Sequence, residues 1–169
     1  MVRYGALACA DWYNLYMDIV SDFTLNSLIQ IIDQELKEKH LMSALFMALT
    51  IPDICSKNNH YIEWYDAWVA NDGPFAISGE DCYRKLRCGI LHNGKTKKGF
   101  SLSCDSKNDI HLGHIICIET DNNTGEEKKH IRVNINELVE NILEGARAFI
   151  GKEGDIELFR LMDYGKVED

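Results

Sequence analysis

Residues 25–39 read LNSLIQIIDQELKEK, and this stretch decides the fold class. Its apolar residues recur at the three- and four-residue spacing of an amphipathic helix: Leu25, Leu28, Ile29, Ile32 and Leu36. Thr24 precedes the stretch and is a typical N-cap. Residues 136–150, NELVENILEGARAFI, repeat the pattern, with Asn136 as the predicted cap and Gly151 as the predicted end. The sequence therefore predicts a mainly α protein.

Three more helices are predicted between these two, over residues 41–57, 60–70 and 78–93. The first is apolar nearly all round, and Pro52 should kink it or end it near Ile51. The second carries an aromatic stripe, which favours core packing over a platform for stacking bases: Tyr61, Trp64, Tyr65 and Trp68. Ser78 caps the third, which stops at Asn93-Gly94. Weaker patterns predict helices over residues 6–20 and 155–163.

The apolar period changes from 3.6 to 2 near Phe100. Alternating or β-branched segments follow, separated by a turn cluster from Asp121 to Gly125; they cover residues 100–104, 110–118 and 131–135. We expect two or three antiparallel strands around a hairpin. The predicted fold is an up-and-down helical bundle with an inserted antiparallel β-hairpin. It forms one domain over residues 1–169, with a helical core at about 6–94 and 136–150 and the insertion at about 100–135.

Charge and cysteine content limit the class of protein. Lys and Arg number 18 and Asp and Glu 27, so the net charge of −9 excludes a uniformly basic nucleic-acid binder. A local basic patch remains compatible with that total. No apolar run is long enough for a signal segment or a membrane span. Several of the 6 cysteines lie in apolar helical patterns. We expect a cytoplasmic protein with reduced thiols and no membrane association.

Basic residues gather in one segment, residues 82–99, which contains no acid. They are Arg84, Lys85, Arg87, Lys95, Lys97 and Lys98. One interpretation is a helix C-terminus whose cations suit the helix dipole. The other is a phosphate-binding site that continues into a loop flanked by glycines. The second interpretation makes Arg84, Asn93, Lys95, Lys97 and Lys98 candidate substrate-binding residues.

Arg87 and His92 add chemistry to this segment. A guanidinium presents a planar fork to phosphate oxygens, and an imidazole exchanges a proton near neutral pH. Together they suffice to cleave an RNA phosphodiester, because the RNA supplies its own 2′-hydroxyl nucleophile and no metal or other cofactor is needed. Side chains five residues apart on an α-helix point about 140° from each other. We therefore expect the pair to converge only if the helix frays near His92 or a second protomer completes the site.

Two other groups of residues are alternative candidates for a functional site. Cys88 and His92 are four residues apart and could meet as a thiolate–imidazole pair, without a visible orienting acid. A zinc site is the other interpretation, although its spacing lacks a Cys-x2-4-Cys knuckle; its ligands would be Cys104, His111, His114 and Cys117. A further alternative, without catalysis, is a plain helical domain whose basic loop contacts an acidic partner. The sequence contains no Gly-x-Gly-x-x-Gly and no P-loop.

Residues 82–94, CYRKLRCGILHNG, resemble the Arg-x4-6-His signature of the HEPN superfamily, the higher eukaryotes and prokaryotes nucleotide-binding domain. The match is to uncharacterised bacterial members, and it extends over residues 41–94. The resemblance implies a helical up-and-down bundle, often a two-fold homodimer whose motif residues face each other across a cleft. It also implies a metal-independent endoribonuclease of toxin–antitoxin, defence or RNA-processing systems. Arg87 and His92 would be its catalytic pair.

The same resemblance implies partners and an alternative. RNA is the implied substrate, and an antitoxin or nucleotidyltransferase-type protein is the implied partner. Many active members carry a polar residue after the motif arginine, where this chain has Cys88. The alternative is therefore a catalytically silent HEPN-like binding or dimerisation module. We predict a homodimer in which the 78–93 helices of two chains approach each other.

Overall fold

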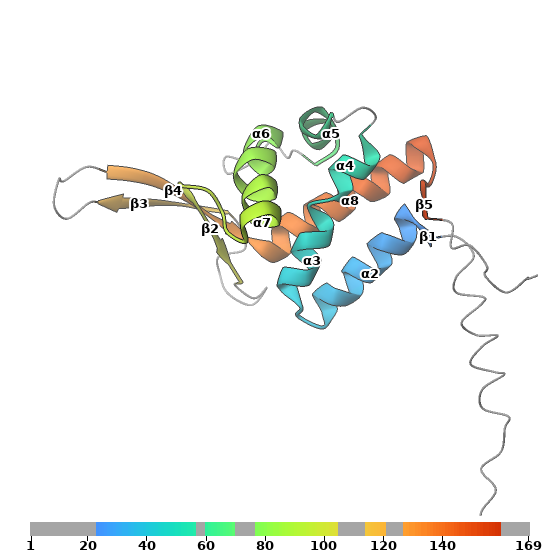
Figure 1. The fold of residues 1–169 in the computed structure, drawn as a ribbon, viewed down its shortest axis with the longest axis horizontal. Coiled ribbons are helices and arrows are strands. Elements are labelled where there is room, and N and C mark those ends of the chain that lie inside the picture. The colour runs from blue at the N-terminus through green and yellow to red at the C-terminus, as the bar shows by residue number, and fades with distance from the viewer. Residues whose placement is uncertain (1–22, 57–59, 70–76, 105–113, 121–126, 160–169) are drawn as a thin grey trace, which may run out of the picture.

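A computed structural model of the chain describes residues 23–56, 60–69, 77–104, 114–120 and 127–159. Figure 1 shows a body of helices from which a narrow sheet extends on one side. These described residues are mainly helical and include two small β-sheets. The predicted helix at 6–20 lies outside the described residues. Within the described residues, no helix combines the length and apolarity needed to cross a bilayer.

The first described helix follows the sequence prediction closely. α2 (Leu25–Lys37) begins after Thr24, whose side chain accepts from the backbone N–H of Ser27 and forms a capping box with it. The predicted apolar face lies in the core, since Leu25, Leu28, Ile29 and Ile32 are all buried. A short two-stranded sheet lies at the start of this helix.

The helix predicted over residues 41–57 is interrupted close to Ile51, where the sequence predicts a kink or an end. The chain forms two helices here, α3 (Leu41–Ala48) and α4 (Ile51–Cys55). Pro52 does not end a helix but lies in the first turn of α4, where its missing N–H costs nothing. The break therefore falls before the proline, at Leu49 and Thr50.

The aromatic stripe packs in the core, as predicted. α5 (Tyr61–Trp68) buries Tyr61, Trp64 and Tyr65, and Trp68 packs edge-on against Phe149. These rings bury large apolar areas against their neighbours. Tyr61, Trp64 and Tyr65 are therefore too buried to stack bases, whereas Trp68 is half-buried.

The predicted helix over residues 78–93 is confirmed, with one irregularity. It runs through α6 (Gly79–Asp81), the π-helical turn η1 (Cys82–Arg87) and α7 (Cys88–Asn93). Ser78 caps it by accepting from the backbone N–H of Asp81. The π turn is marked by a bond from the Cys88 N–H to the Tyr83 carbonyl. Such turns are frequent at functional sites, and this one ends at Arg87, the first residue of the Arg/His motif.

The β insertion has a different pairing from the one expected. β3 (Ile115–Thr120) and β4 (Glu127–Asn134) form the predicted antiparallel hairpin. β2 (Phe100–Ser103) pairs with the other edge of β4 and runs parallel to it, so the expectation of only antiparallel strands is wrong. In the strand order β2-β4-β3, β4 is the central strand, with β2 parallel to it on one side and β3 antiparallel to it on the other.

The last helix lies across the helical body and contacts most of it. α8 (Ile135–Glu153) packs against α2, α3, α4 and α5 (Figure 1). It begins two residues earlier than predicted, because the cap is Asn134 and not Asn136. The Asn134 Oδ1 accepts from the Glu137 N–H. It also continues through Gly151 to Glu153, because Gly154 is the residue that ends it.

The helix predicted over residues 155–163 is wrong where the structure describes it. Residues Glu157–Phe159 form strand β5, which pairs antiparallel with β1 (Phe23–Thr24). The Leu25 N–H also donates to the Ile156 carbonyl at 2.8 Å. These bonds join the start of α2 to the segment after α8.

Candidate functional site

The Arg87 side chain bonds to Asp53, which lies 34 residues earlier in the sequence. Its Nε donates to Asp53 Oδ2 at 3.0 Å, and its Nη2 lies 2.9 Å from the same oxygen. Asp53 belongs to α4, and Arg87 ends the π turn. The pair therefore joins α4 to the helix formed by α6, η1 and α7, which we call the motif helix. Both side chains are only part-exposed. The carboxylate therefore fixes one edge of the guanidinium and leaves Nη1 free to face elsewhere.

His92 occupies that remaining direction. Arg87 Nη1 and His92 Nε2 lie 3.0 Å apart within one chain. The expectation that this pair needs a frayed helix or a second protomer is therefore wrong. α7 stays helical to Asn93, and the long arginine side chain spans the angular gap between the two positions on the helix. Convergence of the pair therefore gives no argument for a dimer.

The geometry fixes the roles in this hydrogen bond. A guanidinium has only donors, so His92 Nε2 must accept and carry no proton in this arrangement. Partial burial lowers the pKa of Arg87, but the charge of Asp53 and its hydrogen bond raise it, and the net direction is upward. Arg87 also lies over the ring of Tyr83, 5.5 Å from its centroid. The guanidinium is therefore permanently charged and held on two sides.

Cys88 lies beside this pair. Its side chain is half-buried, and its interaction with the guanidinium contributes to the raised pKa of Arg87. The hydrogen bond of His92 in the structure goes to Arg87. The thiolate–imidazole interpretation therefore stays a prediction that the geometry does not favour.

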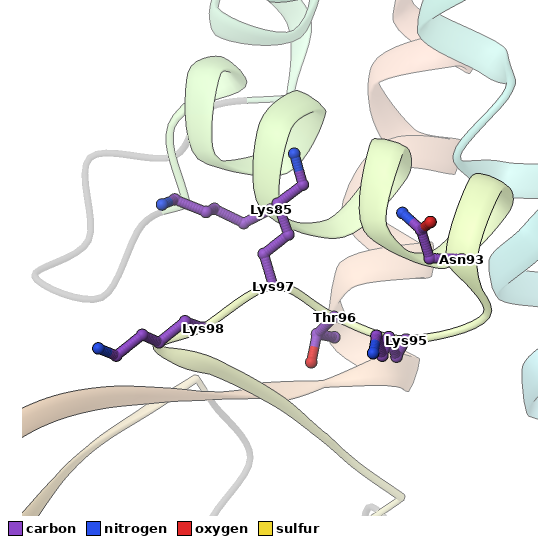
Figure 2. Close-up of a pocket in the computed structure, with 6 residues that line it drawn as sticks. All are labelled: Lys85, Asn93, Lys95, Thr96, Lys97 and Lys98. Carbon is purple, nitrogen blue, oxygen red and sulfur yellow. The ribbon is translucent and has the colours of Figure 1, made fainter.

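The predicted substrate-binding residues divide into separate groups. Lys95, Lys97 and Lys98 line a hollow of about 530 Å³ together with three further residues, as Figure 2 shows: Lys85, Asn93 and Thr96. Arg84 is not among them; it is exposed and pairs with Glu80 one turn earlier, at 3.1 Å. Neither Arg87 nor His92 lines the hollow. The basic segment therefore provides Arg87 and His92, which form a cluster with Asp53 of α4, and a distinct group of lysines, whose pocket we call the lysine hollow.

The loop that carries the lysines is tied to the motif helix. The Lys97 N–H donates to the Lys85 carbonyl at 3.1 Å, and the Lys95 N–H donates to the Gly89 carbonyl at 3.4 Å. A Cβ on Gly89 would lie 2.6 Å from the Lys95 carbonyl oxygen, so only glycine permits this approach. Gly94, with φ 66°, ends the helix in the left-handed region and turns the chain back.

His114, a residue of the zinc interpretation, has a structural role. It is buried, and its Nδ1 accepts from the Asn134 N–H at 3.3 Å. Glu137 Oε2 lies 3.4 Å from the same nitrogen. Burial lowers the pKa of His114 to about 4 and raises that of Glu137, so the close approach is not an ion pair at neutral pH.

The rest of the zinc interpretation is not tested, because His111 lies outside the described residues. Among the residues that the structure describes, one group of three has ligand atoms close enough to share a metal: Glu35, Glu38 and His40. That group is largely exposed at the end of α2, and nothing further points to an ion there.

Two members of the candidate site are missing from the sequence prediction. Asp53 carries a signal that could have found it, since it is the only charged residue within residues 41–55. Tyr83 carries none, because aromatic residues at helical spacing usually indicate core packing. Lys85 was visible as part of the basic segment, but its place beside the loop depends on the turn at Gly94.

Comparison with protein families, curated proteins and solved structures yields no match for this chain. The geometry of the described residues is therefore the basis for a functional proposal.

Proposed function

We propose that the protein is a HEPN-like, metal-independent endoribonuclease whose reaction uses Arg87 and His92. The observation that carries the proposal is the 3.0 Å contact between Arg87 Nη1 and His92 Nε2, with Asp53 holding the opposite edge of the guanidinium. A fixed cation beside an exposed imidazole is the minimal set for this chemistry. The sequence resemblance over residues 41–94 supports the same assignment.

The reaction follows from these two side chains. A phosphodiester bound at Arg87 takes hydrogen bonds from the guanidinium and releases His92 Nε2 from it. The freed nitrogen accepts the proton of the 2′-hydroxyl, or in its protonated form gives one to the 5′-oxygen. The 2′-oxygen bonds to phosphorus, the bond to the 5′-oxygen breaks, and a 2′,3′-cyclic phosphate results. Arg87 stabilises the charge that grows on the phosphoryl oxygens.

The local acid content supports a reaction without metal. Mg²⁺ is bound in proteins by one or two carboxylates with several waters. Asp53 is the carboxylate paired with Arg87, and its Oδ2 already accepts both guanidinium hydrogen bonds. Its charge is thus used to hold the arginine.

A cleavage assay with total RNA in EDTA tests the proposal. We expect the wild-type protein to cleave, and His92→Ala to lose about 10²–10⁴ in rate. Arg87→Ala should be similarly impaired, and Arg87→Lys should not restore activity, because a point charge cannot reproduce the planar fork. Lys37→Ala, at the exposed end of α2, is the control and should retain activity. Cleavage that survives in both site variants, or that requires Mg²⁺, would contradict the proposal.

A catalytically silent HEPN-like module is the second candidate, and one observation favours it. Asp53 occupies the Nε and Nη2 edge of Arg87, which is the edge that would otherwise receive a phosphate side-on. A guanidinium neutralised in this way is a structural ion pair. Wild-type protein that binds RNA without ever cleaving it would support this candidate, with Cys88 as the first residue to replace.

A further inference from the structure

We propose that the lysine hollow is a second phosphate subsite, which holds the RNA backbone beyond the scissile bond. This inference rests on the proposed function, because it assigns the longer substrate that the Arg87–His92 pair would act on. It predicts that the protein binds and prefers extended single-stranded RNA over a dinucleotide.

The lysine hollow is a local concentration of positive charge. Four of its six lining residues are lysines, and none is acidic. Among the described residues, no carboxylate forms an ion pair with any of these four. The chain as a whole has a net charge of −9, so acids were abundant elsewhere. Lysines without carboxylate partners create a local positive potential that attracts a polyanion.

The backbone beneath the lysines is held in place. Besides the bonds from Lys95 and Lys97 to the motif helix, Thr96 Oγ1 donates to the Phe100 carbonyl at 2.6 Å. The Gly99 carbonyl accepts from Ile131 of β4 at 2.8 Å, so the loop is joined to the sheet as well. A loop fixed at both ends loses little backbone freedom on binding, so the ordering cost is confined to the lysine side chains.

The lysines are spread along the loop rather than gathered around one point. In Figure 2, Lys85 and Lys98 extend in the same direction, Lys97 rises across the helix, and Lys95 lies at the other end of the loop. Such an arrangement suits successive phosphates of a backbone better than one isolated anion. Asn93 and His92 are neighbours at the end of α7, so the hollow begins one residue from the candidate base.

These two sites imply a division of labour. The reacting phosphate would lie at Arg87 and His92, and a neighbouring phosphate would lie in the hollow. Lysines there act on affinity through counterion release and leave the chemical step alone. A dinucleotide has a single phosphodiester and cannot reach both sites.

Binding of a non-cleavable probe tests the subsite without relying on catalysis. The probe is a fluorescent single-stranded 2′-O-methyl RNA oligonucleotide, measured by anisotropy over a series of salt concentrations. Each lysine–phosphate contact contributes a slope of about −0.7 in log K against log salt. Replacing Lys97 and Lys98 with alanine should therefore flatten the slope by about 1.4. Lys37→Ala with Lys39→Asn is the matched control: it removes the same charge at the end of α2, and asparagine tolerates the positive φ of position 39.

The outcomes separate the subsite from the proposed nuclease. Tight binding by the wild type and the control, with loss in Lys97→Ala/Lys98→Ala, supports the subsite even if no RNA is ever cleaved. Equal loss in both double variants would overturn it, since that result reports net charge alone. Absence of wild-type binding would also overturn it. Displacement of the probe by a poly-glutamate peptide at lower concentration than by unlabelled RNA would assign the hollow to an acidic protein instead.

A length series adds a catalytic readout. If the protein cleaves, kcat/KM should be higher for an oligonucleotide than for a dinucleotide, and Lys97→Ala/Lys98→Ala should remove this preference. A fall in kcat on the dinucleotide would place the lysines in the reaction itself and contradict the subsite.

Discussion

Asp53 holds one edge of the Arg87 guanidinium and thereby determines which nitrogen faces His92. A fully charged arginine needs no help to stay protonated, so the value of this carboxylate lies in geometry. It fixes an otherwise flexible side chain beside an exposed imidazole. In the proposed reaction Asp53 is thus a positioning residue.

Replacing Asp53 tests that role. Asp53→Asn keeps an oxygen that can accept from Arg87 but removes the charge, so the guanidinium should be held less firmly. We expect kcat to fall by up to about 10²-fold, the cost of misplacing a catalytic group by about 1 Å. The pH–rate profile should keep its shape, because Asp53 transfers no proton. A shifted profile would show that Asp53 takes part in proton transfer.

His114 predicts a pH dependence of stability. Burial lowers its pKa to about 4 in the folded state, against an ordinary value of 6.5. The unfolded chain therefore binds more protons in this interval, and stability falls as the pH drops from about 6.5 towards 4. The loss is up to about 3 kcal/mol. The raised pKa of Glu137 acts in the opposite direction, because its protonation favours the folded state at low pH.

A variant separates these two contributions. His114→Asn keeps a side-chain acceptor for the Asn134 N–H but does not titrate. Urea unfolding at several pH values should show a smaller loss of stability between pH 6.5 and 4 in this variant than in the wild type. Parallel curves for the two proteins would mean that His114 is protonated in the folded state.

At the scale of helices and strands, local chemistry predicts some boundaries and not others. Thr24 caps α2 as expected, since a threonine before an apolar-periodic run has few rivals nearby. Asn134 and Asn136 are both possible caps for α8, and the sequence favours neither by rule. The structure uses Asn134, the residue at which β4 ends, and Asn136 lies within the first turn of the helix. Pro52 was ambiguous for a similar reason, because proline both ends one helix and starts another.

Local sequence patterns do not predict which strands pair with each other. The alternation in residues 100–104 predicts a strand but neither its neighbour nor its direction, and in the structure it pairs with β4 and runs parallel to it. Residues 157–159 have a mixed pattern, and their strand exists because β1 offers an edge to pair with. The same limit applies to the site. Arg87 and His92 are visible in one motif, but Asp53 reaches them only through packing of α4 on the motif helix.

Gly89 allows a test at this scale. Gly89→Ala would place a Cβ 2.6 Å from the Lys95 carbonyl oxygen and 3.2 Å from the Lys97 nitrogen. Both are backbone atoms, so the loop must move away from the helix. We expect a loss of about 1–3 kcal/mol in unfolding free energy and weaker binding of the non-cleavable oligonucleotide.

Gly151→Ala is the matched control for this change. Gly151 is also helical, but a Cβ there meets nothing within 4 Å. Alanine should stabilise α8 by up to about 1 kcal/mol through helix propensity. Chemical denaturation of both variants gives the comparison. Equal stability of Gly89→Ala and the wild type would show that the loop is not packed on the helix.

At the scale of the whole molecule, the homodimer stays a proposal based on the resemblance. We expect two chains to associate with their motif helices facing each other. Cys88 is a half-buried residue of that helix, and in this arrangement we expect its thiol to lie near the partner's. Sedimentation should give a dimer at tens of micromolar protein, and a short bis-maleimide should cross-link it through Cys88 in a Cys9→Ser/Cys104→Ser/Cys117→Ser background. A monomer at that concentration would contradict the proposal.

The central claim is that Arg87 and His92 direct attack by the 2′-hydroxyl of RNA without a metal. The most direct measurement is cleavage of a defined RNA oligonucleotide in EDTA, with mass analysis of the product ends and a single 2′-deoxy substitution at the scissile nucleotide. The account predicts 2′,3′-cyclic phosphate ends from the wild type, no cleavage at the 2′-deoxy position, and no products from His92→Ala. Cleavage at the 2′-deoxy position, or products that end in a 3′-hydroxyl, would contradict it.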